Sequence, residues 1–91
     1  MNFVYRVHAL ERMFQRSITE EEVEESVRLG EVIESYEDDK PYPSYLTLYF
    51  VADKAIHVVF AKNEEEIFVV ITVYEPSLNK WEDDMKIRRQ L

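Results

Sequence analysis

The chain contains no cysteine, one glycine and three prolines among its 91 residues. Without cysteine it can form neither a disulfide framework nor a thiolate zinc site. A single glycine excludes a glycine-rich phosphate-binding loop. No apolar run is long enough to span a bilayer and no signal peptide is recognisable, so we expect a cytoplasmic protein without a membrane partner.

The two histidines lie far apart in the sequence and form no HxxxH or HExxH motif. We therefore predict neither a metal site nor any other cofactor. Hydrophobic residues make up 46% of the chain and charged residues 33%. A chain of this size buries one modest core, which predicts a single domain over residues 1–91.

Negative charge is unevenly distributed along the chain. The formal net charge is −8, and residues 19–39 hold ten acidic residues against the single base Arg28. This segment should repel polyanions and attract a basic partner, although it can equally be a solvated helix face. The rest of the chain has a slight excess of bases, and we expect a locally positive region formed by Arg12, Arg16, Arg88 and Arg89.

The first predicted helix covers residues 5–16. An apolar stripe at the spacing i, i+3, i+7 predicts its buried face. This stripe consists of Val7, Leu10 and Phe14, and Met13 widens it. A second stripe at i, i+4, i+8 carries polar and basic side chains that stack along the helix. It consists of His8, Arg12 and Arg16.

The second predicted helix has clear boundaries. Thr19, followed three residues later by Glu22, is typical of a capping box. Gly30 is expected to end the helix in the left-handed conformation. Because the turn between the two helices is short, they should form a helical hairpin.

After Gly30 the apolar residues alternate, which predicts strands. Four strands are expected, at residues 32–36, 44–51, 55–61 and 67–74. The last two are apolar on both faces and should be the central pair. Leu78, Trp81 and Met85 then recur at helical spacing, which predicts a helix over residues 78–91. The predicted fold is therefore α+β, with an N-terminal helical hairpin, a four-stranded antiparallel sheet and a C-terminal helix.

Histidine is the side chain that most readily exchanges protons near neutral pH, so His8 and His57 are candidates for acid and base chemistry. Metal-independent RNA cleavage also needs cations to stabilise charge on phosphorus, and Arg12 and Arg16 are of the right type. The alternative is structural: His57 lies within a predicted strand, and His8 can cap or pack the first helix. Among the tyrosines, Tyr74 is predicted to position a substrate.

Four segments together resemble one bacterial protein family. They are HALERMFQRSIT at 8–19, PYPS at 41–44, HVVFA at 57–61 and ITVYEP at 71–76, followed by Trp81. The family is the domain of unknown function DUF4258, and its order of elements is similar to that of RelE-like toxins of the barnase, EndoU, colicin and RelE fold group. The resemblance implies a RelE-like toxin, an endoribonuclease encoded beside an antitoxin.

The resemblance and the residue types together give a site hypothesis. The predicted catalytic residues are His8, Arg12, His57 and Tyr74, and the predicted RNA-binding residues are Arg16, Lys80, Arg88 and Arg89. The expected partners are RNA, a cognate antitoxin protein and further copies of the chain. The alternatives are a non-catalytic protein-interaction module of the same fold and a small binding protein. The acidic second helix argues against ribosome-dependent cleavage.

Overall fold

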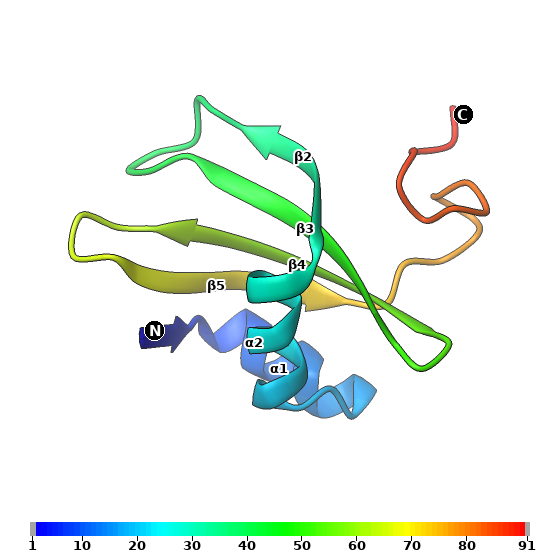
Figure 1. Ribbon diagram of the computed structural model, residues 1–91, viewed down its shortest axis with the longest axis horizontal. Helices are drawn as coiled ribbons and strands as arrows, with labels where there is room; N and C mark the ends of the chain where they lie inside the picture. The colour runs from blue at the N-terminus through cyan, green and yellow to red at the C-terminus, as the bar shows by residue number, and fades with distance from the viewer. Residues whose placement is uncertain (1, 91) are drawn as a thin grey trace.

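A five-stranded sheet carries both helices on one face, and an irregular C-terminal segment reaches the other face (Figure 1). The computed structural model describes residues 2–90. The elements in chain order are β1 (Asn2–Tyr5), α1 (Val7–Arg16), α2 (Glu20–Leu29), β2 (Glu31–Tyr36), β3 (Ser44–Val51), β4 (Lys54–Lys62) and β5 (Ile67–Tyr74). The strand order across the sheet is β1-β5-β4-β3-β2.

The prediction of a four-stranded antiparallel sheet is wrong because residues 2–5 add a fifth strand. The four predicted strands do form antiparallel pairs, and β4 and β5 are internal as expected. The added strand β1 runs parallel to β5, so the sheet is mixed. Its side chains contribute to the pairing, since the rings of Phe3 and Phe68 stack with centroids 5.2 Å apart. So short a segment becomes a strand only through this contact with a distant part of the chain.

The predicted C-terminal helix is absent from residues 76–90, and Leu91 lies outside the described residues. Instead the segment folds back on itself, with an isolated bridge between Trp81 and Arg88. Trp81 is buried, whereas Leu78, expected on the same helical stripe, is 53% exposed. The backbone oxygen of Met85 accepts a hydrogen bond from His57. The burial of Trp81 and the hydrogen bond from His57 to Met85 outweigh helix propensity, which is weak for a short helix.

The buried face of α1 also differs from the prediction. Ala9 and Met13 pack against the sheet, whereas the predicted stripe points outward. Its exposed fractions are 71% for Val7, 44% for Leu10 and 89% for Phe14. The small side chain of Ala9 lets the helix lie close to β5. The sequence pattern identified a helix correctly, and Met13 is buried as expected, but the stripe of Val7, Leu10 and Phe14 was wrongly assigned to the core.

The start of α2 is as predicted. The Thr19 side chain accepts a hydrogen bond from the backbone of Glu22 at 3.1 Å, and the Glu22 carboxylate accepts one from the backbone of Thr19 at 3.0 Å. These reciprocal bonds satisfy two backbone donors that have no partner within the helix. The capping box is therefore confirmed. Val23, which follows it, is fully buried in the core between helices and sheet.

Gly30 ends α2, but for a different reason from the one predicted. Its backbone is extended, with φ −72° and ψ 166°, rather than left-handed. A Cβ atom at this position would lie 2.4 Å from the backbone oxygen of Ser26 and 2.9 Å from that of Leu48. Glycine is required because two segments of backbone approach each other closely here.

Gly30→Ala is therefore expected to lower the free energy of unfolding by about 1–3 kcal/mol, the usual cost of forcing extra atoms into a packed site. Urea denaturation measures the change. Ser35→Ala, at an exposed position of β2, should change stability by less than about 0.5 kcal/mol. Equal stability of Gly30→Ala and the wild type would show that the backbone moves apart freely at this point.

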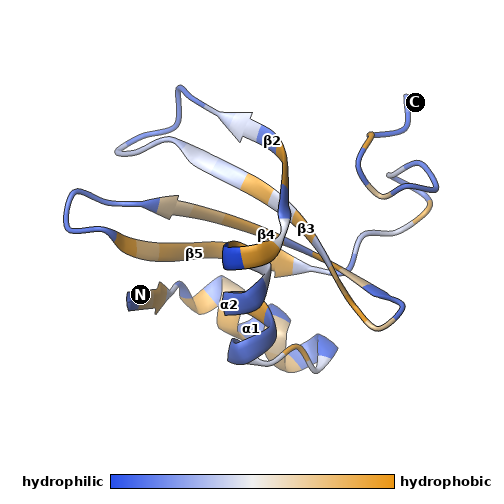
Figure 2. Cartoon of the chain, in the orientation of Figure 1, coloured by the Kyte–Doolittle hydropathy of each residue, from blue (hydrophilic) through white to orange (hydrophobic). Residues whose placement is uncertain are grey.

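Both faces of the sheet are covered. Ile56, Val58 and Phe60 of β4 face the helices and belong to the main core. His57 faces the other way and lies beside Leu48 of β3 and Tyr74 of β5. Leu46, Leu48 and Trp81 are also buried on this second face. Figure 2 shows the resulting apolar character of β4 and β5, which contrasts with the hydrophilic loops.

Candidate functional site

A cleft of about 410 Å³ lies where β5 leaves the sheet. β1 pairs with β5 only as far as Val70, so the last residues of β5 form an open edge. α1 borders this edge on one side and the C-terminal segment borders it on the other. The cleft is lined by Arg12, Arg16, Thr72, Tyr74, Glu75, Pro76, Ser77, Lys80, Trp81 and Arg88.

Four cationic side chains line the cleft and come from two distant parts of the sequence. Arg12 and Arg16 lie one turn apart on α1, while Lys80 and Arg88 belong to the C-terminal segment. Within residues 2–90, the first three of these make no ion pair. Within the described part of the chain, Glu75 is the one acidic residue that lines the cleft. The cleft is therefore locally positive in a chain whose net charge is −8.

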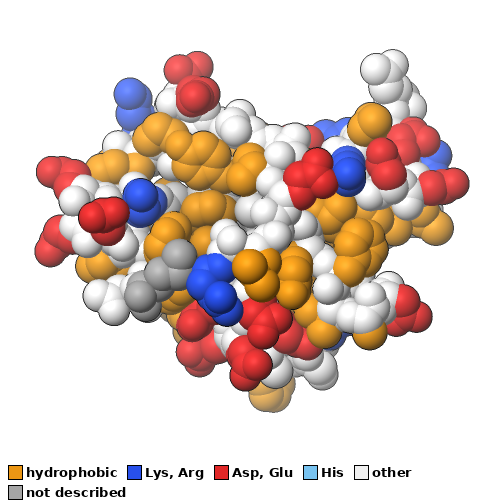
Figure 3. All heavy atoms as spheres, in the orientation of Figure 1, with side chains coloured by type: hydrophobic (Ala, Val, Ile, Leu, Met, Phe, Trp, Pro, Cys, Tyr) orange, Lys and Arg blue, Asp and Glu red, His pale blue; other side chains and the backbone are white. Residues whose placement is uncertain are grey.

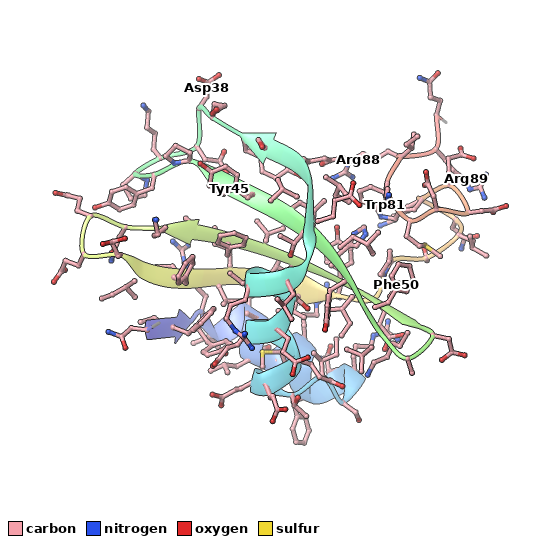
Figure 4. The ribbon with its side chains drawn as sticks, in the orientation of Figure 1. Asp38, Tyr45, Phe50, Trp81, Arg88 and Arg89 are labelled. Atoms are coloured by element: carbon pink, nitrogen blue, oxygen red, sulfur yellow. The ribbon has the colours of Figure 1, made fainter. Side chains whose placement is uncertain are left out.

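Arg88 differs from the other cations because its charge is already paired. Its guanidinium donates two hydrogen bonds to the Glu34 carboxylate, at 2.9 and 3.0 Å, and lies 4.6 Å from the centre of the Trp81 ring. Burial alone would raise the pKa of Glu34, but hydrogen bonds from Arg88 and Tyr36 outweigh it and lower that pKa. Arg88 thus fastens the C-terminal segment to β2 (Figure 4).

His57 lies behind the cleft and has no solvent exposure. Its Nε2 atom is 2.8 Å from the backbone oxygen of Met85, and its Nδ1 atom is 3.2 Å from the Tyr74 hydroxyl. A backbone oxygen only accepts, so Nε2 carries the proton and Nδ1 accepts from Tyr74. Burial lowers the pKa of His57, although the Met85 carbonyl opposes this. The ring is therefore neutral near pH 7.

Tyr74 connects this buried network to the cleft. Burial raises the pKa of its hydroxyl to about 12, so the group keeps its proton. That proton is donated to Nδ1 of His57. The Trp81 ring packs edge-on against the His57 ring, with centroids 4.5 Å apart. The position of the Tyr74 hydroxyl is thus determined by His57, which is itself held by the C-terminal segment.

The structure brings together five of the eight predicted site residues in one cleft: Arg12, Arg16, Tyr74, Lys80 and Arg88. His57 does not line the cleft, but it contacts two residues that do, Tyr74 and Trp81. His8 is exposed on α1 and is not among the residues that line the cleft. Arg89 lies on the outer side of the C-terminal segment, where it bonds to Leu78 and Glu82 (Figure 4).

Thr72, Glu75 and Ser77 line the cleft but were not predicted. Thr72 and Tyr74 lie two residues apart on β5, and this alternation was the one sequence signal that could have linked Thr72 to Tyr74. The pairing of Glu34 with Arg88 had no local signal, since 54 positions separate the two residues. Among residues 2–90 no group of three or more potential ligands is arranged to hold a metal ion. The helices in that range are all too short or too polar to cross a membrane.

The fold and the site define a small α+β protein with a basic cleft at the open edge of β5. Residues 5–75 match a family described as a domain of unknown function, DUF4258. The chain belongs to this family, because the match covers most of its length. Neither the comparison with curated proteins nor the comparison with solved structures gave a match. The further similarity to RelE-like toxins is not supported by these comparisons.

Proposed function

We propose that this protein binds RNA in the cleft and cleaves it as a metal-independent, toxin-like endoribonuclease. The observation that carries the proposal is that Arg12, Arg16 and Lys80 line one cleft together with Tyr74. These cations lack ion-pair partners within the described part of the chain, so their charge is available to a ligand. In an acidic protein, such a cluster favours a polyanion.

The spacing of the two arginines suits a phosphodiester backbone. Arg12 and Arg16 are separated by about 6 Å along the helix axis. Each guanidinium is a planar donor that can bond to two phosphate oxygens at once. The two side chains can therefore bind one phosphate together or contact successive phosphates of a single strand.

The proposed reaction is transesterification within the RNA. The 2′-oxygen attacks phosphorus and the bond to the 5′-oxygen breaks, giving a 2′,3′-cyclic phosphate and a free 5′-hydroxyl. Glu75, which lines the cleft, is the proposed acceptor of the 2′-hydroxyl proton. Arg12 and Arg16 stabilise the charge that develops on the phosphate oxygens. Glu75 then passes this proton to the leaving 5′-oxygen, because His8 does not line the cleft.

His57 takes a positioning role in this proposal. Its ring is inaccessible to a substrate and both of its nitrogens are hydrogen-bonded. It therefore acts on RNA through the orientation of the Tyr74 hydroxyl. A toxin of this kind would be paired with an antitoxin protein, which remains part of the proposal.

Binding of a fluorescent single-stranded RNA, followed by anisotropy at increasing salt, tests the first step. Arg12→Ala and Arg16→Ala should each weaken binding about tenfold and reduce its salt dependence, because each removes a phosphate contact. Arg28→Ala is the matched control, since it removes the same charge from an exposed position of α2. Equal binding by all three variants would show that RNA does not occupy the cleft.

A further inference from the structure

α1 carries an apolar surface that faces away from the sheet. Val7, Leu10 and Phe14 recur at helical spacing, and Phe14 is 89% exposed. Ala9 and Met13 already provide the contact between this helix and the core. Isolated exposed apolar residues are normal. Three exposed apolar residues along one helix stripe, including an almost fully exposed phenylalanine, are typical of an interaction surface. We call these three residues the α1 stripe.

The α1 stripe is separate from the basic cleft. Phe14 lies two residues from Arg12 and two from Arg16, which is about 200° around the helix from each. The two arginines line the cleft, so Phe14 must point away from it. A partner on the stripe can therefore bind without contacting the RNA-binding residues.

Acidic side chains lie near this surface. The Tyr5 hydroxyl, two residues before α1 begins, donates a hydrogen bond to Glu24 of α2 at 3.0 Å. The first turn of α2 adds Glu20 and Glu21, both exposed. Figure 3 shows acidic side chains gathered where α2 lies, with apolar side chains below them at the lower edge. On α1 itself, the exposed Glu11 lies four residues after Val7 and three residues before Phe14, so an acidic side chain borders the stripe.

We propose that the α1 stripe and the acidic residues at the start of α2 bind a basic, amphipathic helix of another protein. Leucine-like side chains of the partner would pack between those of the stripe, as ridges of one helix fit the grooves of another. Its lysines and arginines would face Glu20 and Glu21. A second copy of this chain fits poorly, because it would bring the acidic residues of two molecules together.

The probe is a fluorescent synthetic peptide with leucines at i, i+3, i+4 and i+7 and lysines elsewhere, and its scrambled version is the control. Phe14→Ser should weaken binding of the peptide by about 30-fold, as expected for an exposed aromatic anchor. Ile87→Ser is the matched variant, because Ile87 is 61% exposed but lies on the C-terminal segment. It should leave the affinity unchanged. The double variant Glu20→Lys and Glu21→Lys should also weaken binding and reduce its dependence on salt.

Three results would overturn the proposal: no binding of the peptide, equal binding of its scrambled version, or equal loss in Phe14→Ser and Ile87→Ser. Sedimentation velocity at increasing protein concentration tests whether a second copy of this chain binds the stripe. A dimer that forms in the wild type and is lost in Phe14→Ser would assign the stripe to self-association instead. Neither variant should disturb folding, since both side chains are mostly exposed.

Discussion

Arg12→Ala is expected to lower the rate of RNA cleavage by about a hundred- to a thousandfold. The reason is the loss of a guanidinium that faces charge developing in the transition state, where one such donor contributes most strongly. The rate is measured with a fluorescent RNA under single-turnover conditions, and the 2′,3′-cyclic phosphate is identified at the new end. Arg12→Lys keeps the charge but loses the planar donor pair, so its rate should lie in between.

Arg28→Ala serves as the control for charge, and circular dichroism checks that every variant is folded. Expression of the wild type alone should arrest bacterial growth, and Arg12→Ala should restore it. A folded wild-type protein that cleaves neither cellular nor naked RNA would rule out the nuclease. The non-catalytic interaction module would then be the better reading of the fold.

Trp81→Ala is expected to lower the free energy of unfolding by about 3–5 kcal/mol, the usual cost of removing a large buried aromatic side chain. Trp81 is 2% exposed, packs against the His57 ring and lies beneath the Arg88 guanidinium. Its loss would leave a cavity on the second face of the sheet. Urea denaturation measures the change.

Leu78→Ala is the matched control for this effect. Leu78 belongs to the same segment but is 53% exposed, so its loss should change stability by less than about 1 kcal/mol. A helix with Leu78, Trp81 and Met85 on its buried face would instead make both substitutions costly. Similar effects of the two variants would therefore contradict the irregular, folded-back arrangement of residues 76–90.

The C-terminal segment also links stability to the site. It contributes Lys80 and Arg88 to the cleft, and its Met85 carbonyl holds the ring of His57. Destabilising the segment should therefore disturb the cleft before the rest of the domain. In the proposed nuclease, His57 would act through this coupling and not by contact with the substrate.

Local sequence signals predicted the parts of the fold that depend on near neighbours. The alternation of apolar residues predicted the bounds 44–51, and a run of apolar residues on both faces predicted the bounds 67–74; these are the bounds of β3 and β5. The reciprocal bonds of Thr19 and Glu22 span three positions, so their residue types alone predicted the start of α2. The i, i+4 spacing of Arg12 and Arg16 likewise placed both side chains on one side of a helix, from which both reach the cleft.

The signals failed where partners are distant in the sequence. β1 is a strand because it pairs with β5, about 65 positions later, and nothing within four residues announces this. In α1, the side that carries the small Ala9 packs against the sheet, whereas the predicted side that carries the larger Phe14 faces outward. The helical periodicity of residues 78–91 did not produce a helix, because Trp81 and Arg88 contact the sheet instead.

The sequence by itself determined the family, the class of the fold and the residue types available for binding an anion. Tertiary structure decided which of those residues meet. It ended the pairing of β1 with β5 at Val70 and so left an edge of β5 open for the cleft, it buried His57 behind Tyr74, and it paired Arg88 with Glu34. The physical reason is that periodicity and capping act over a few residues, whereas burial and ion pairing depend on segments that only folding brings together.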